Sequence, residues 1–215
     1  MLKIQRFVFN MFAENTYVIS DETKECIFLD CGAFYSEERA AVRRYIETEN
    51  LKPTHLLCSH GHLDHVLGNG FLYQEYGLKA EVHADDEMLI KNLRQQAFDM
   101  VGMNYTEPLA PIGKYLRATD ILSFGNHQME IIHTPGHTPG GVVFFCKEEK
   151  VAFTGDTLFN MSVGRTDFPG GSWVQLMQSL KTLTEHLPKD TTLLTGHGSQ
   201  TTMEYECQWN PYLKN

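Results

Sequence analysis

The densest set of metal-binding side chains in the sequence is the six-residue run His-Gly-His-Leu-Asp-His at residues 60–65. Neutral imidazole nitrogens and carboxylate oxygens are good ligands for divalent transition metals such as zinc. Residues 54–59, with Leu56, Leu57 and Cys58 among them, predict a short buried strand that leads directly into this run, and residues 63–76 have helical spacing. Because a strand end fixes the backbone while the following turn aims several side chains at one point, we predict a metal site here.

Three further polar residues share one setting, since each follows a predicted strand and has a glycine beside it: His137, Asp156 and His197. Glycine lets a backbone approach a crowded site closely, and segments that follow rigid elements often carry functional side chains. We therefore expect these residues to join the histidine-rich run. The predicted metal ligands are His60, His62, Asp64, His65, His137, Asp156 and His197.

In its order and spacing, this set resembles the metallo-β-lactamase superfamily, and within it the glyoxalase II-like (hydroxyacylglutathione hydrolase-like) enzymes, in the short form that keeps only the catalytic domain. The resemblance extends from residues 15–17 to residues 210–212. It implies an α/β (α+β) fold, the αββα four-layer sandwich. It further implies that His60, His62 and His137 hold one metal ion. Asp64, His65 and His197 would hold a second ion, and Asp156 would bridge the two.

Two cations held about 3.5–4 Å apart can share a water molecule and make a hydroxide nucleophile from it near neutral pH. We expect two divalent metal ions, with zinc as first choice and iron or manganese as alternatives. Asp64 and Asp156 are the predicted catalytic carboxylates. The expected reaction is hydrolysis of a thioester such as S-hydroxyacylglutathione. Only 18 residues follow His197, whereas relatives that hold glutathione use an additional helical region there, so another acyl thioester or ester stays open.

Residues 162–171 form a glycine-rich loop that we expect at the mouth of the site. Arg165 is the predicted substrate residue, either through a substrate carboxylate or, alternatively, paired with Asp167 to shape the loop. Candidate groups that orient the ligands are Asp30, Ser59 and Thr157. Five histidines receive no catalytic role: His55, His83, His127, His133 and His186. Of these, His133 is worth checking because it lies four residues before His137.

Four other functions compete with the hydrolase prediction. A persulfide dioxygenase would use one iron ion held by His60, His137 and Asp156. β-Lactam hydrolysis is disfavoured because lactamases typically lack an aspartate at the bridging position. A nuclease is disfavoured by the net charge of −9, which repels a phosphate backbone. A non-catalytic binding module is disfavoured because the whole ligand set is present.

The elements that must position these residues alternate between strands and helices. In the first half we predict strands at residues 3–9, 16–19, 26–29, 54–59 and 80–83, a helix at 36–49 with Ser36 as its N-cap, and a cap at Asp85. Residues 89–117 predict a helix and then an irregular segment, either a lid or a surface insertion. The second half predicts strands at 129–133, 142–146, 151–154 and 191–195, and a helix at 172–186 that begins at Ser172.

The composition is that of a globular protein, with 215 residues, 42% apolar and 21% charged. We predict a single domain over residues 1–215, as a monomer or homodimer that acts on a small-molecule acyl thioester or ester. No segment reads as a membrane span or a secretory signal, and neither nucleic acid nor membrane is an expected partner. The five scattered cysteines predict reduced thiols and a cytoplasmic location, with Cys26, Cys58 and Cys146 in the core.

Overall fold

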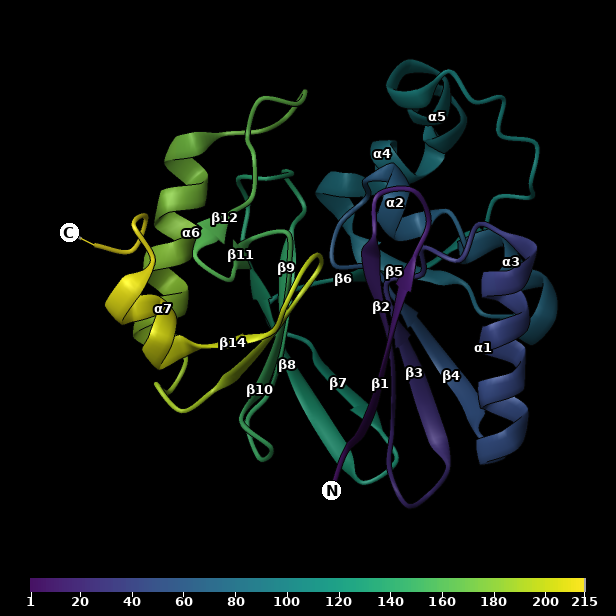
Figure 1. Ribbon diagram of the computed structural model, residues 1–215, viewed down its shortest axis with the longest axis horizontal. Coiled ribbons are helices and arrows are strands. Elements are labelled where there is room, and N and C mark those ends of the chain that lie inside the picture. The colour runs from purple at the N-terminus through teal and green to yellow at the C-terminus, as the bar shows by residue number, and fades with distance from the viewer. Residues whose placement is uncertain (215) are drawn as a thin grey trace.

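Two six-stranded sheets pack face to face in the computed structural model, which describes residues 1–214 (Figure 1). The strands of the first sheet, in spatial order, are β1 (Lys3–Phe9), β2 (Glu14–Ser20), β3 (Glu25–Leu29), β4 (Lys52–Leu57), β5 (Ala80–His83) and β6 (Ile112–Leu116). Those of the second are β14 (Thr201–Thr202), β13 (Thr192–Thr195), β10 (Val151–Gly155), β9 (Val142–Cys146), β8 (His127–His133) and β7 (Ile121–Phe124). A short hairpin, β11 (Leu158–Phe159) and β12 (Ser162–Val163), forms a third sheet.

Helices cover the outer face of each sheet, which completes four layers (Figure 1). The first half of the chain supplies α1 (Ser36–Glu49), α2 (Leu63–Val66), α3 (Asn69–Tyr76), the 3₁₀ turn η1 (Ala84–Asp86), α4 (Glu87–Lys91) and α5 (Leu93–Val101). The second half supplies α6 (Trp173–His186) and α7 (Met203–Trp209). The predicted αββα sandwich is confirmed.

The main core lies between the two sheets, where inward-facing side chains of both are fully buried. Tyr17 of β2 and Phe153 of β10 meet edge to face with ring centroids 5.3 Å apart. The Tyr17 hydroxyl also donates to the Thr195 carbonyl at the end of β13, at 2.8 Å. Because a buried phenol needs a hydrogen-bond partner, this contact fixes the relative position of the sheets as well as filling the core.

Most predicted elements have the predicted type, with bounds shifted by one or two residues. Ser172 is the N-cap of α6, as predicted, and accepts from the Gln175 amide. Two predicted caps are wrong. Tyr35 occupies the N-cap of α1, so Ser36 is already helical. Asp85 lies inside η1 and does not cap α4.

Two segments depart from their local patterns for tertiary reasons. The helical spacing of residues 63–76 is continuous, yet α2 and α3 are separate, and Gly68 lies between them. A Cβ at Gly68 would stand 2.5 Å from the Cys31 sulfur, so the chain bends where this close approach occurs. In residues 89–117, the helix and irregular segment are as predicted, but β6 was not anticipated.

Cys26, Cys58 and Cys146 are fully buried, as predicted, and all five thiols are free. Within residues 1–214 no helix has both the length and the apolar character needed to span a bilayer.

Candidate metal centre

The structure brings all seven predicted ligands to one end of the two sheets, although they are distant in sequence. The run at 60–65 follows β4 of the first sheet and enters α2. His137 lies in the loop between β8 and β9, Asp156 directly follows β10, and His197 follows β13, all in the second sheet. The candidate centre therefore lies where the ends of the two sheets meet, as the strand-end pattern predicted.

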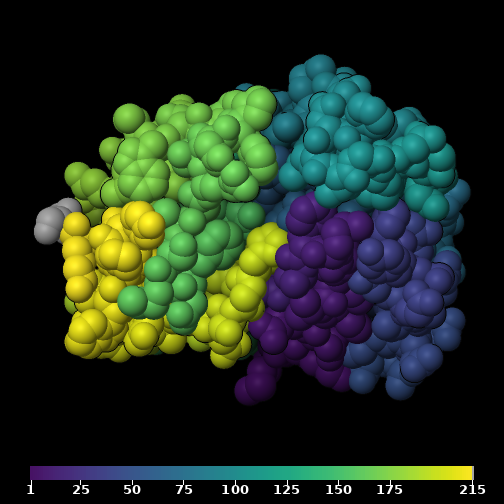
Figure 2. Space-filling model, turned by 45° about the horizontal axis from the view of Figure 1, so that its top comes forward, coloured from purple at the N-terminus to yellow at the C-terminus, as the bar shows by residue number. Residues whose placement is uncertain are grey.

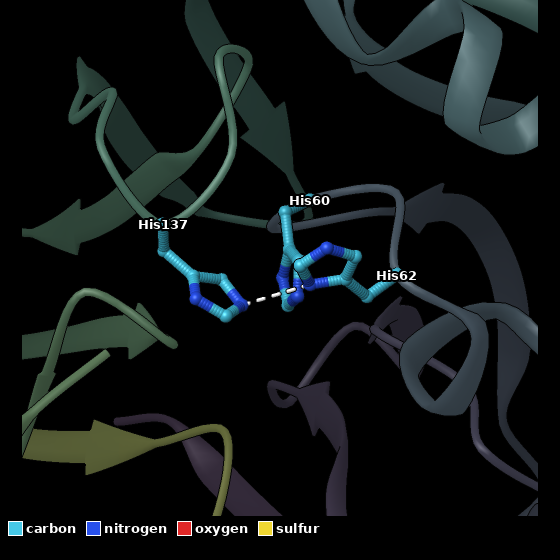
Figure 3. Close-up of side chains that lie close together, drawn as sticks. All are labelled: His60, His62 and His137. Atoms are coloured by element: carbon cyan, nitrogen blue, oxygen red, sulfur yellow. Dashed lines mark hydrogen bonds between the residues drawn. The ribbon is translucent and has the colours of Figure 1, made fainter. Parts of the chain in front are cut away.

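His60, His62 and His137 form the first group of donors, and Figure 3 shows their rings converging from two sides. One nitrogen from each ring lies within 4.8 Å of the others. His62 Nδ1 and His137 Nε2 are 2.8 Å apart. Three buried imidazoles that converge in this way form a ligand set that suits a divalent transition metal.

Asp64, His65 and His197 form the second group, again with donor atoms within 4.8 Å of one another. His197 Nε2 is 3.0 Å from Asp64 Oδ2 and 3.2 Å from His65 Nε2. The Asp156 carboxylate stands between the groups. Its Oδ1 is 3.3 Å from His65 Nε2, and its Oδ2 is 3.4 Å from His137 Nε2. A bridging role for Asp156 is consistent with this position.

Hydrogen bonds on the far side of the rings fix which nitrogen faces the centre. The Ser59 hydroxyl donates to Asp30 Oδ2 at 2.7 Å, so its oxygen accepts from His60 Nδ1 at 3.0 Å. His65 Nδ1 donates to the same Asp30 oxygen at 2.9 Å. His137 Nδ1 donates to the Arg165 carbonyl at 2.7 Å. Each of these imidazoles therefore directs its Nε2 toward the centre, as metal-ligating histidines commonly do.

Of the predicted orienting residues, Asp30 and Ser59 contact the ligands and Thr157 does not. The Thr157 hydroxyl bonds the Thr134 hydroxyl instead, at 3.0 Å. Asp30 is almost completely buried and also accepts from the Ser59 amide at 2.7 Å. Its φ of 56° places it in the left-handed region, so it serves as a turn residue too.

The two groups differ in charge. Burial and the surrounding imidazoles lower the pKa of His60 well below its usual value, and burial with the His137 ring lowers the pKa of His62 to about 3. Burial also lowers the pKa of His65, but the carboxylates of Asp156 and Asp64 outweigh burial and raise that pKa well above its usual value. The second group thus attracts positive charge, whereas His60 and His62 offer neutral nitrogens.

A further observation supports the fit of these residues to a pair of cations. His60 Nε2 and Asp156 Oδ1 are buried, and neither has a hydrogen-bond partner within residues 1–214. Buried polar atoms are nearly always paired, and an unpaired one calls for an explanation such as an ion. Both atoms belong to the clusters described above, so cations at the centre would satisfy them.

Two adjoining cavities open from the centre toward solvent. The inner one, about 390 Å³, includes Asp64, His137, Asp156 and His197 in its lining. The outer one, about 590 Å³, extends to Leu89 and to α5. Both are lined by five of the same residues: Phe12, His62, Met100, Arg165 and Phe168. Figure 2 shows the green segment after β10 facing the teal α5 segment across this part of the surface.

Arg165 lines both cavities, and of its two predicted contacts the structure shows the one with Asp167. Its Nε and Nη2 atoms each donate to one Asp167 oxygen at 2.6 Å. The guanidinium also lies over the Phe168 ring, 4.2 Å from its centroid. The Arg165 carbonyl orients His137, a contact that side-chain patterns cannot indicate.

Sequence reasoning missed Asp86, which joins the two ligand loops. Its carboxylate accepts from the Gly61 amide at 2.9 Å, the Thr138 hydroxyl at 2.7 Å and the Gly140 amide at 2.6 Å. Gly61 lies between His60 and His62, and Thr138 follows His137. The only available signal was a pair of adjacent aspartates at a helix start, and helix capping explained that pair equally well.

We predict that Asp30→Asn weakens metal binding by about 10–100-fold. The asparagine side chain has one acceptor oxygen, so it cannot accept from the His65 ring, the Ser59 hydroxyl and the Ser59 backbone N–H together. Asparagine tolerates the left-handed backbone of this position, so the substitution tests the charge and not the turn. Chelator competition measures the effect.

Asp21→Asn is the matched control, because Asp21 Oδ2 also bonds a buried histidine, His127, at 3.0 Å but lies outside the centre. Equal metal affinity in the two variants would remove Asp30 from the role of orienting ligands.

Comparisons with known proteins agree with this geometry. The family model described as "Metallo-beta-lactamase superfamily" matches residues 10–197. A hydroxyacylglutathione hydrolase, GloC of Haemophilus influenzae, is 37% identical over 95% of this chain and 94% of its own. The crystal structure of the BLEG-1 B3 metallo-beta-lactamase has a TM-score of 0.89 at 28% identity, with full coverage of both chains. That of TTHA1623 in a di-iron-bound form has a TM-score of 0.86 at 31% identity, over 97% of this chain and all of its own.

Proposed function

The chain belongs to the metallo-β-lactamase superfamily and is a metallo-hydrolase of that family, and from this premise we propose that it hydrolyses thioesters, with S-hydroxyacylglutathione as the first candidate. We further propose that His60, His62 and His137 hold one metal ion, that Asp64, His65 and His197 hold a second, and that Asp156 bridges them. Zinc is our first choice for both ions, and the di-iron form of TTHA1623 keeps iron as the alternative.

When bound, the two ions would supply the Lewis acidity that polarises a carbonyl group and acidifies a water molecule. The chain supplies the positioning. Asp156 reaches both donor groups, so it sets their separation. Burial raises the pKa of Asp64, but His65 and the hydrogen bond from His197 outweigh burial and lower it, so Asp64 stays a carboxylate that can accept a hydrogen bond from water.

The observation that carries the thioester proposal is the lining of the inner cavity. Apart from the candidate ligands, the residues within 1–214 that line it are Phe12, Met100, Phe159, Ser162, Val163, Arg165 and Phe168. None of these side chains has a carboxyl, imidazole, thiol or phenol group. A leaving group there must depart without an acid of suitable pKa beside it. A thiolate can do so, because thiols ionise near pH 8.5, whereas an amine leaving group needs a proton.

The resemblance to GloC and to BLEG-1 makes the competing reactions testable side by side. Purified protein of known metal content should be assayed with thioesters of glutathione and of other thiols, with oxygen esters of the same acyl groups, and with nitrocefin. We expect kcat/KM to be highest for a thioester and turnover of nitrocefin to be absent. Faster hydrolysis of nitrocefin than of every thioester would replace this proposal with β-lactam hydrolysis.

Oxygen consumption by protein that holds a single iron ion would instead support the persulfide dioxygenase alternative. The second donor group argues against that alternative, since donor atoms of Asp64, His65 and His197 also lie within 4.8 Å of one another.

We predict that Arg165→Ala raises KM about tenfold while metal content is kept, because one charge-assisted contact with the substrate is lost. The side chain is exposed at the cavity mouth, and its carbonyl contact with His137 survives the substitution. Lys181→Ala, which removes an exposed cation from α6, is the control for net charge. If KM and kcat both stay at the wild-type values, Arg165 has no part in substrate binding.

A further inference from the structure

Two histidines outside the candidate metal centre, His83 and His133, stack on each other where strands of different sheets end. Their ring centroids are 4.1 Å apart and the rings are inclined by 14°. His83 ends β5 of the first sheet, and His133 ends β8 of the second. Asp85 of η1 stands beside them, with its Oδ2 3.6 Å from His83 Nδ1. One donor atom from each of the three residues lies within 4.8 Å of the other two.

The hydrogen bonds of the two rings show which nitrogen of each carries a lone pair. His133 Nε2 is 3.0 Å from the Pro139 carbonyl, which can only accept, so Nε2 carries the proton and Nδ1 the lone pair. His83 Nδ1 accepts from the Asp85 amide at 3.3 Å and therefore also has its lone pair. An ion bound to this nitrogen would replace the contact with the amide. A ring N–H held by a backbone carbonyl is a common feature of metal-ligating histidines. Burial and the His133 ring lower the pKa of His83, which favours the neutral form that binds metals.

We propose that His83, Asp85 and His133 form an additional site for a divalent transition-metal ion, which clamps the ends of the two sheets together. Two imidazoles and one carboxylate suit zinc and its neighbours better than calcium or magnesium. A tetrahedral zinc ion places its donors about 3.3 Å apart, so donor atoms that now lie within 4.8 Å must converge by up to about 1.5 Å. Because the ion lies near the plane of each imidazole that binds it, the two stacked rings must also turn out of their near-parallel arrangement. The Asp85 side chain is 58% exposed and free to turn, and a water molecule would complete the coordination.

This site, which we call the His83–His133 site, lies one residue from Asp86. Asp86 accepts from the Gly61 amide and from the Thr138 hydroxyl. These two contacts connect the loop that carries His60 and His62 to the loop that carries His137. An ion bound beside it would brace the framework of the candidate centre without contacting substrate. Because the ligands come from both sheets, binding requires the folded sandwich, and the ion stabilises it by linkage.

The experiment uses protein whose tightly held ions are already bound and counted. Zn²⁺ is then titrated by calorimetry, and the melting temperature is followed in parallel. We expect one further ion per chain and a rise in melting temperature of about 5 °C or more at a hundredfold excess over Kd. The absence of a further ion in the wild-type protein overturns the proposal.

Two variants locate the ion. Asp85→Asn changes an exposed side chain and keeps its shape, and His83→Ala removes one imidazole. Each should weaken binding of the further ion at least about tenfold, while the tightly held ions stay bound. The controls are Glu148→Gln, an exposed carboxylate, and His186→Ala, a half-exposed histidine paired with Glu130.

Unchanged titration in Asp85→Asn and in folded His83→Ala would place the ion elsewhere and refute the site. Because the readouts are ion binding and melting temperature, failure of this site is distinguishable from failure of the thioester hydrolase proposal, which the substrate panel tests alone.

Discussion

Asp156→Ala is expected to lower kcat by about a thousandfold or more and to reduce bound metal, because the variant loses a carboxylate that reaches both donor groups. Asp156 Oδ1 faces His65 and Oδ2 faces His137. Burial raises the pKa of Asp156, yet the His65 ring beside it holds that pKa well below its usual range, so the group is ionised. Removal therefore takes a buried negative charge from a cluster of imidazoles and weakens the attraction for cations.

Asp156→Asn separates charge from shape in this prediction. It keeps the side-chain volume but offers one oxygen instead of two, so we expect a loss close to that of Asp156→Ala. His62→Ala should also lose metal and turnover, because His62 Nδ1 is one of the three donors of the first group. Metal analysis and the thioester assay measure both effects, with exposed Glu148→Ala as the control. Full activity with full metal content in Asp156→Ala would contradict the assigned role.

The position of the site was predictable from the sequence because its ligands are tied to local signals. A strand pattern ends just before His60, His137, Asp156 and His197, and glycine stands beside each of the last three. The glycine signal has a physical basis in the structure. A Cβ at Gly196 would lie 2.2 Å from Asp156 Oδ1, so only glycine lets the β13 loop approach the carboxylate.

Contacts between distant segments were not predictable in this way. Asp86 meets Thr138 across 52 positions of sequence, and nothing in either local pattern indicates the partner. The β6 sequence Ile-Gly-Lys-Tyr-Leu at residues 112–116 has weak alternation, and it becomes a strand because β5 offers a parallel edge to pair with. His83 and His133 each read as ordinary strand residues, and only the packing of the two sheets stacks their rings.

Gly136→Ala should be the most destabilising of the substitutions considered, because it combines backbone strain with a clash against helix backbone. Gly136 has φ of 142°, which L-residues rarely adopt. A Cβ there would lie 2.3 Å from the Leu176 amide nitrogen and 2.4 Å from its Cα, in the first turns of α6. The Gly136 carbonyl also accepts from Ser172, the N-cap of that helix, at 2.7 Å. The loop cannot move away without breaking the start of α6.

We expect Gly136→Ala to lower the free energy of unfolding by about 3 kcal/mol or more, from strain of about 1–3 kcal/mol and overpacking of similar size. That corresponds to a fall in melting temperature of roughly 6–12 °C for a chain of this length. Gly77→Ala is the matched control, because Gly77 has φ of 71° and its Cβ would meet nothing within 4 Å. The control has a positive φ without the clash, so a Gly136→Ala variant that melts no lower than Gly77→Ala would show that α6 moves to accommodate the methyl group. Since the residue after Gly136 is His137, displacement of the loop should also reduce bound metal, which separates this effect from a general loss of stability.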